Sequence, residues 1–172
     1  MTEATSVVEG QAPGPLAGVA ITAIVLVVIA AWVVVGMQFF SDDKTLFGGF
    51  LLLWHWANNE AMEIKRLPSA ITGALIGIFL AWFVVFATGS WGGAGIAAGL
   101  LLIVAALYLD VIKTLPFAVN SSTTLFLTIA AAPLVQLSVN WTELVLSVVI
   151  GGLFFGVLIE GIKQLAAKFG GN

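Results

Sequence analysis

Polar side chains able to contact a small molecule gather in one stretch of this otherwise apolar sequence. Pro116 cannot continue a helix, and it biases the residue before it toward extended backbone. Three strong helix-capping residues follow, Asn120, Ser121 and Ser122, and then Thr124. If residues 115–119, with Phe117 among them, re-enter the membrane as extended chain at about 3.3 Å per residue, Asn120 lies roughly 15 Å deep.

A helix N-terminus at that depth would present unpaired N–H groups and a positive dipole end to a carbonyl oxygen or a small anion. Irregular backbone within a bilayer is tolerated only where it is buried in protein or lines a wet cavity. The stretch therefore predicts part of a solute path. The alternative is an ordinary capped helix start at the interface, whose hydroxyls satisfy backbone groups.

Two further polar segments are candidates for the same path. Asp42 and Asp43 precede the second apolar run and would attract cations or hydrogen-bond donors, unless they are ordinary helix caps. His55, the one histidine, could titrate near neutral pH and gate a pore. Asn58 and Asn59 could line a cytoplasmic vestibule. For the histidine segment, which is flanked by tryptophans, the alternative is anchoring at the membrane interface.

Enzyme chemistry has no support in the sequence. There is no cysteine, no HExxH motif, no Gly-rich phosphate loop and no nucleophile elbow, so we predict no catalytic centre, no cofactor and no metal site. No charged residue lies in the middle of a predicted span, which weakens the case for an ion-coupled carrier. The net charge of −3 and the pI near 4.9 argue against nucleic acid as a partner.

The elements that must position these residues are membrane-spanning helices. Of the 172 residues, 60% are hydrophobic and 9% are charged, so the chain is predicted to be an all-α integral membrane protein in a lipid bilayer. A lipid-facing β-barrel would require period-2 alternation, which the apolar runs lack. We predict six helices, of which the second and fifth are short or broken: 16–37, 45–58, 68–86, 93–109, 121–137 and 141–165.

The basic residues predict the orientation. Six spans with a cytoplasmic N-terminus place five of the six basic residues in the cytoplasm and leave only Lys44 outside, as the positive-inside rule requires. The five are Lys65, Arg66, Lys113, Lys163 and Lys168. The expected location is a bacterial or archaeal cytoplasmic (inner) membrane, with both termini cytoplasmic and residues 1–15 forming a disordered tail.

A weak internal repeat divides the remainder of the chain into residues 16–92 and 93–172. Aligning the sequence with itself brings the pair Gly73 and Gly77 onto Gly152 and Gly156. Three spans per copy make this an inverted-topology repeat, a feature that recurs in transporters and channels. Each glycine pair permits close helix packing, either within the chain or in a homo-oligomer, for which we expect a dimer or trimer.

Several segments resemble a small bacterial inner-membrane family catalogued as domain of unknown function 1097. The resemblance lies in the short second span, the segment Pro116–Thr124 and the Trp, Leu and Gly pattern of Trp141–Gly156, and it covers about residues 25–165. The chain departs from the family at Asn120 to Ser122 and at the polar stretch His55–Asn59. Because that family has no assigned activity, the resemblance implies fold and location rather than a substrate.

Two functions remain open from the sequence. The first is a channel or facilitator that passes a small polar solute, uncharged or a small anion, between the two repeats. The second is a non-transporting accessory or structural subunit that binds lipid, a pigment or a partner protein. A wet path lined by Asn120–Thr124 would favour the first, and a dry interior of Leu, Phe and Val would favour the second.

Overall fold

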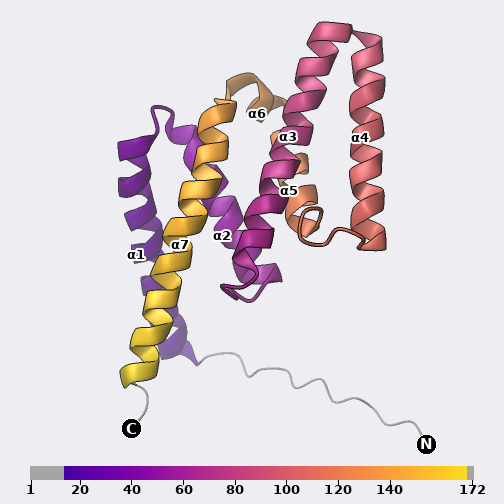
Figure 1. Ribbon diagram of the computed structural model, residues 1–172. Coiled ribbons are helices and arrows are strands. Elements are labelled where there is room, and N and C mark those ends of the chain that lie inside the picture. Colours follow the sequence, from indigo (N-terminus) through magenta and orange to yellow (C-terminus); the bar gives the residue numbers. More distant parts are fainter. Residues whose placement is uncertain (1–13, 170–172) are drawn as a thin grey trace, which may run out of the picture.

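The computed structural model describes residues 14–169, and that part of the chain is helical with no strand (Figure 1). The elements are α1 (Pro15–Phe39), η1 (Asp43–Leu46), α2 (Phe47–Asn59), α3 (Leu67–Trp91), α4 (Gly93–Ile112), α5 (Ser121–Ala130), α6 (Pro133–Ser138) and α7 (Trp141–Phe169). The tail expected at residues 1–15 lies almost wholly outside the described residues.

Four of these helices are long and apolar enough to cross a membrane, namely α1, α3, α4 and α7. The prediction of an α-helical membrane protein is confirmed at this level. The two predicted short spans correspond to shorter helices, since α2 has 13 residues and α5 has 10. The fifth predicted helix is divided because Pro133 follows the extended residue Ala132, so that α6 starts as a separate turn.

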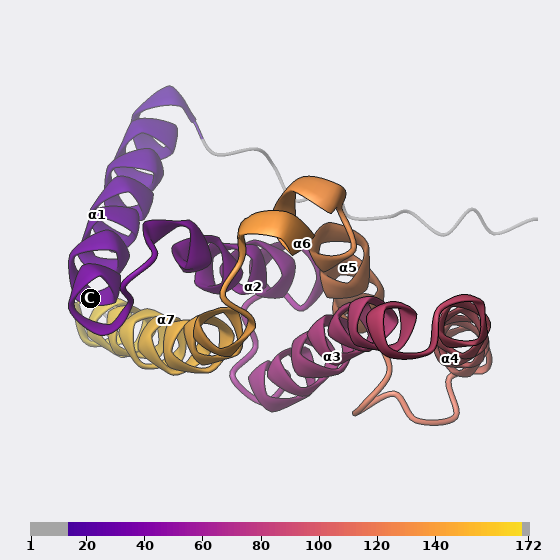
Figure 2. The ribbon, with the colours of Figure 1, turned by 90° about the horizontal axis from the view of Figure 1, so that it is seen from above.

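The long helices stand in the order α1, α7, α3, α4, and the short helices α2 and α5 lie behind α7 and α3 (Figure 2). Helix α2 packs chiefly on α7, and α5 packs chiefly on α3. A tight turn at Gly92, with φ +56°, joins α3 to α4. This connection is shorter than the gap between the predicted helices 68–86 and 93–109, because helix α3 continues to Trp91. The start of α1 and the end of α7 lie at the same end of the bundle (Figure 1).

The centre of the bundle is a dry cluster to which both short helices contribute. Leu52 of α2 and Phe126 of α5 are each 1% exposed, and they pack with Ala70 and Ala74 of α3 and with Leu144 and Val148 of α7. A second cluster fixes α1 through the fully buried Trp32, whose indole Nε1 donates a hydrogen bond to the Leu46 carbonyl at 3.1 Å. The space between the two halves of the chain is therefore filled mainly by apolar side chains, with Ser122 and Ser147 buried among them.

The helix starts relate the two described halves by a different register from the one expected. When Phe47, the start of α2, is aligned with Ser121, the start of α5, the start of α3 at Leu67 falls on the start of α7 at Trp141. The register that pairs Gly73 with Gly152 does not bring these starts together. The expected register was drawn from residue identities, in which abundant small and apolar residues dominate, and it therefore differs from the register of the helix starts.

All four glycines of the aligned pairs are buried within the chain. A Cβ on Gly73 would meet the side chain of Asn120, and one on Gly77 would clash with the carbonyl oxygen of Thr123. Gly152 approaches Ile71, and Gly156 approaches Leu67. The glycines thus pack helices against one another. Of the two roles left open for these glycines, the structure shows packing within the chain, because α3, α5 and the loop before α3 already cover them.

Candidate functional site

The segment between α4 and α5 is a compact turn, so the expected extended re-entrant chain is wrong. Lys113 ends α4 in the left-handed region with φ 53°. The backbone N–H groups of Ala118 and Val119 then both donate to the Leu115 carbonyl, at 3.0 and 2.8 Å. Pro116 does stop the helix as predicted, but it lies within a hydrogen-bonded turn whose other side chains, including Phe117, are mostly exposed.

Asn120 lies at the start of α5, beside the first two turns of α3. Its Nδ2 donates to the carbonyls of Ser69 and Pro116, at 3.1 and 3.2 Å, and its side chain fits against Gly73. Ser69 and Gly73 belong to the first two turns of α3, about 3 and 9 Å along the axis from Leu67. The chain reaches this position from Lys113 by turning back on itself instead of running as extended backbone.

The hydroxyl groups of this segment are engaged within the protein. The Asn120 Oδ1 accepts the Ser122 N–H at 2.9 Å as a helix cap. Ser122 Oγ donates to the Ala70 carbonyl at 2.8 Å, and Thr124 Oγ1 donates to Asp110 Oδ2 at 3.3 Å, while Ser121 is exposed. The arrangement closes the start of α5 and docks it on α3, which was the alternative that the sequence left open.

The acidic segment lies at the end of the bundle that carries Glu143, and its groups also bond within the protein. Asp42 Oδ1 accepts the Lys44 N–H at 3.1 Å and caps η1. The Ser41 hydroxyl and the Asp42 N–H both donate to the carboxylate of Glu143 in the first turn of α7. Asp43 lies in η1, and its side chain is outside the described part. Sequence reasoning missed Glu143, although an acidic residue in the first turn after the cap Asn140 is a helix-start signal.

His55 is the one described side chain with a buried polar atom that has no hydrogen-bond partner. The residue is 0% exposed, its Nδ1 lies 3.0 Å from Nδ2 of Asn59, and its Nε2 has no partner. Within the segment expected to anchor at the interface, His55 is thus buried, whereas Trp54 is exposed. Asn58 is exposed at the end of α2, where its Nδ2 donates to the Trp54 carbonyl at 2.8 Å.

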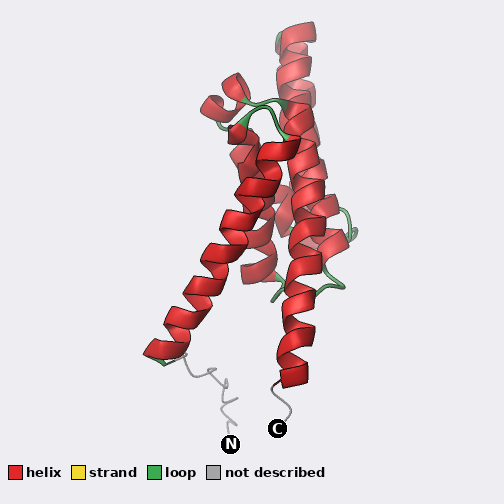
Figure 3. Ribbon diagram, turned by 90° about the vertical axis from the view of Figure 1, so that its left-hand side faces the viewer, coloured by secondary structure: helices red, strands yellow, loops and turns green. Residues whose placement is uncertain are grey.

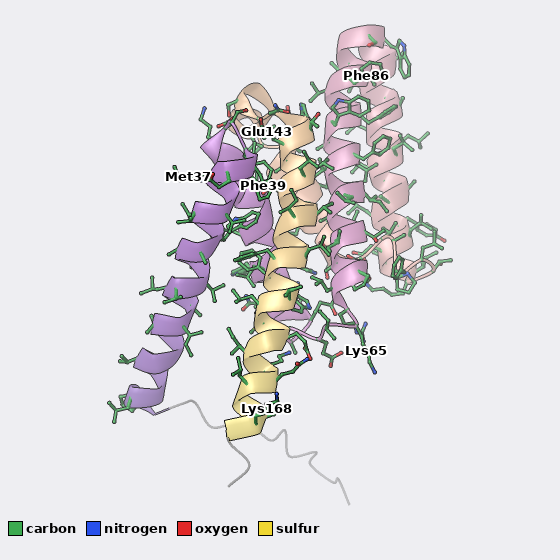
Figure 4. The ribbon with its side chains drawn as sticks, turned by 60° about the vertical axis from the view of Figure 1, so that its left-hand side comes forward. Met37, Phe39, Lys65, Phe86, Glu143 and Lys168 are labelled. Carbon is green, nitrogen blue, oxygen red and sulfur yellow. The ribbon has the colours of Figure 1, made fainter. Side chains whose placement is uncertain are left out.

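An apolar groove of about 590 Å³ lies between α1, α2 and α7. Helices α1 and α7 lie close together near the end that carries Glu143 and diverge toward the end that carries Lys168 (Figures 3 and 4). The groove follows this divergence. Its lining includes Ile24, Val25, Val28 and Ile29 of α1, Phe50, Leu53, Trp54, Ala57 and Asn58 of α2, Met62, and Ile159, Ile162 and Lys163 of α7.

The groove ends at a basic side chain. Lys163 Nζ donates to the Met62 carbonyl at 2.6 Å. Met62 and its neighbour Ala61 both have left-handed backbone, with φ 53° and 49°, which costs roughly 1–2 kcal/mol for each such residue. Strained backbone of this kind persists where the surroundings hold it, and it clusters at ligand sites. Periodicity could not reveal the groove, because the groove depends on the angle between α1 and α7.

The structure thus separates the predicted path residues. Asn120, Ser122 and Thr124 lie at the start of α5, Asp42 beside Glu143, and His55 inside the bundle. Of the predicted path residues, Asn58 lines the apolar groove, whereas these five line neither the groove nor a second apolar hollow of about 440 Å³ between Val35 and α7. The described residues contain no cluster suited to a metal ion. Comparisons with protein-family models, with curated proteins and with solved structures find no match to this chain.

Proposed function

We propose that this chain is a non-enzymatic membrane protein that binds the hydrocarbon chain of a membrane lipid in the groove between α1, α2 and α7. The observation that carries the proposal is the lining of the groove, which is apolar except at the end where Asn58 and Lys163 lie. In a bilayer, such a lining matches an acyl chain and offers nothing to a polar solute.

The level of the groove in the membrane supports this assignment. Glu143 and Lys163 are about 30 Å apart along α7 at 1.5 Å per residue, which is the thickness of the hydrocarbon core. Lys163 therefore belongs at one headgroup level. From Asn58 to Phe50 the groove extends about 12 Å along α2 toward the middle of the bilayer. A lipid with its headgroup beside Lys163 would place its acyl chain in the groove.

Six crossings and an inverted repeat are part of the proposal. In their support, α5 packs on α3 as α2 packs on α7, and one register aligns the starts of both helix pairs. The positive-inside rule then makes the end with Lys65 and Lys168 cytoplasmic, and Glu143 lies at the opposite end (Figure 4). The apolar packing of Leu52 and Phe126 between the repeats favours binding over conduction.

A photoreactive lipid tests the proposal directly. Phosphatidylcholine with a diazirine in its acyl chain is incorporated into vesicles with the full chain, and labelled peptides are mapped after illumination. We expect labels on groove residues such as Val25 and Leu53. The variant Ala57→Trp fills the groove and should remove these labels, whereas Ala97→Trp, on the exposed face of α4, should not. Labelling spread evenly over all lipid-facing helices would contradict the proposal.

One observation favours a second candidate, a facilitator for a small uncharged solute or small anion. The Nε2 of His55 is a buried polar atom with no partner in the protein, and a passing solute or water would supply one. Liposome flux measured over a panel of small solutes tests this candidate. Flux that is lost in His55→Leu and retained in the groove-filling variant would place conduction ahead of lipid binding.

A homo-oligomer also stays a proposal, and it requires a surface other than the buried glycines. Helix α4 offers one, because it packs mainly on α3 and exposes large apolar side chains along its length: Leu101, Val104, Tyr108 and Val111. Mass measurement in mild detergent would reveal a dimer or trimer. A monomeric mass at every protein concentration would exclude the homo-oligomer.

A further inference from the structure

We propose that the groove selects an anionic phospholipid, whose phosphate binds Lys163 while its acyl chain occupies the groove. The inference rests on the proposed lipid-binding function and adds the class of headgroup. It begins with the charge on Lys163, which has no carboxylate partner among residues 14–169. An ammonium group carries three N–H donors, and the Met62 carbonyl uses one of them.

The neighbouring acidic groups are occupied elsewhere. Glu60 and Glu63, in the loop that contains Met62, both lie 3.8 Å from the guanidinium of Arg66. Glu160, one turn before Lys163 on α7, accepts a hydrogen bond from Gln164 at 3.5 Å. None of these three acids forms an ion pair with Lys163. An anion from outside the protein can supply the missing charge.

The remaining groups at this end of the groove fit a phospholipid better than a free anion. Trp54 lines the mouth and is 55% exposed, as is typical of an indole at the headgroup level. Asn58, one turn further along α2, uses its Nδ2 on the Trp54 carbonyl, and its Oδ1 accepts no hydrogen bond within the described chain. This oxygen can accept from a glycerol hydroxyl. A cation, an indole and an amide thus stand at the open end of an apolar groove.

Retained lipid provides the test. The full chain is reconstituted in vesicles of phosphatidylcholine and phosphatidylglycerol in equal amounts, released into mild detergent, and analysed by native mass spectrometry. One interfacial lysine supplies enough binding energy for a preference of about fivefold for the anionic lipid. Lys163→Gln keeps a donor for the Met62 carbonyl and should reduce the preference to parity. Lys168→Gln, further along α7 and outside the groove lining, should leave it unchanged.

The outcomes separate this inference from the function on which it rests. If Lys163→Gln retains the preference, or if Lys168→Gln reduces it equally, the headgroup assignment is wrong. Photolabelling of the groove by diazirine phosphatidylcholine should persist in Lys163→Gln, because the acyl chain still enters. If the wild type shows groove labelling without any headgroup preference, only the inference fails. If the acyl-chain diazirine labels no groove residue in the wild type, both proposals fail.

Discussion

Gly49 and Gly151 bring α2 and α7 into main-chain contact, since a Cβ on Gly151 would lie 2.7 Å from the Cα of Gly49. The register that aligns the helix starts pairs Gly49 with Thr123 and Gly151 with Gly77. Thr123 and Gly77 are also in contact, because a Cβ on Gly77 would meet the Thr123 carbonyl oxygen. Each short helix therefore rests on a glycine of a long helix. Backbone contact of this kind favours helix association in lipid, where hydrophobic burial contributes little.

Adding a methyl group at either contact should destabilise the protein. For Gly77→Ala and Gly151→Ala we expect the free energy of unfolding in detergent to fall by about 1–3 kcal/mol, because main chain cannot move aside as a side chain can. Gly161→Ala is the matched control, as nothing lies within 4 Å of its Cβ position in α7. It should be neutral or stabilise the helix by up to about 1 kcal/mol. Equal effects at all three positions would contradict the packing argument.

The chain lacks cysteine, so single cysteines report topology directly. Lys65 and Lys168 lie toward one end of the bundle, and Lys44 lies next to Asp42 at the end that carries Glu143. With an impermeant maleimide added outside intact cells, we expect Lys44→Cys to react and Lys65→Cys and Lys168→Cys to react only after lysis. Labelling of position 44 on the same side as 65 would exclude six crossings with cytoplasmic termini.

Sequence alone was sufficient for the apolar helices, because hydropathy measures directly what a bilayer requires. It also located Pro116 as a helix stop and Asn120 as a cap. It could not tell an extended re-entrant segment from a turn, since the difference depends on the Leu115 carbonyl accepting two N–H groups. The register drawn from residue identities also differs from the register of the helix starts, because contacts such as Gly49 with Gly151 follow geometry, while residue identity in an apolar chain is uninformative.

The groove illustrates the same limit. Val28 and Ile162 are ordinary lipid-facing residues by sequence, and only the divergence of α1 from α7 places them on opposite walls of one hollow. The sequence placed Lys163 near the end of a span, but it could not show whether an acid neutralises its charge. In the described structure Lys163 forms no ion pair, and the nearby Glu60 and Glu63 both lie beside Arg66.

Asn120→Leu should act on stability rather than selectively on transport. The substitution removes the cap of α5 and the two hydrogen bonds to the Ser69 and Pro116 carbonyls, so we expect a loss of about 2–3 kcal/mol. Asn140→Leu is the control, because Asn140 also caps a helix, through the N–H groups of Thr142 and Glu143. That cap alone is worth about 1 kcal/mol. If the Asn120→Leu protein is as stable as the wild type but has lost solute flux, the result would support the prediction that Asn120 lines a solute path.

His55→Leu tests whether the buried imidazole has a partner outside the protein. If Nε2 is unsatisfied, leucine removes a polar atom that is costly to bury, and the free energy of unfolding should stay within about 1 kcal/mol of wild type or rise. Trp56→Leu provides the contrast, because Trp56 is 1% exposed and donates to the Glu63 carbonyl at 2.9 Å. It should cost about 3 kcal/mol or more. A comparable loss in His55→Leu would show that water or a solute binds Nε2.

Glu143 joins the two halves of the chain at the end opposite Lys163. Its carboxylate accepts from the Ser41 hydroxyl and from the Asp42 N–H at 3.1 Å, and these residues form the turn between α1 and η1. Because this turn sets where α1 leaves α7, breaking the link should loosen α1 and widen the groove. We expect Glu143→Gln to lower the free energy of unfolding, since the acceptor oxygens lose their charge and one of them is replaced by a donor.

A double-mutant cycle with Ser41→Ala isolates the hydroxyl contact. The effects of Ser41→Ala and Glu143→Gln should be non-additive, because the two residues share one hydrogen bond. Ser41→Ala combined with Lys168→Gln serves as the control and should be additive, as those residues lie at opposite ends of the bundle. Spin labels on Val25 and Ile162 would then measure the groove, and their separation should grow in Glu143→Gln. An unchanged separation, together with an additive first cycle, would show that α1 is held by Trp32 alone.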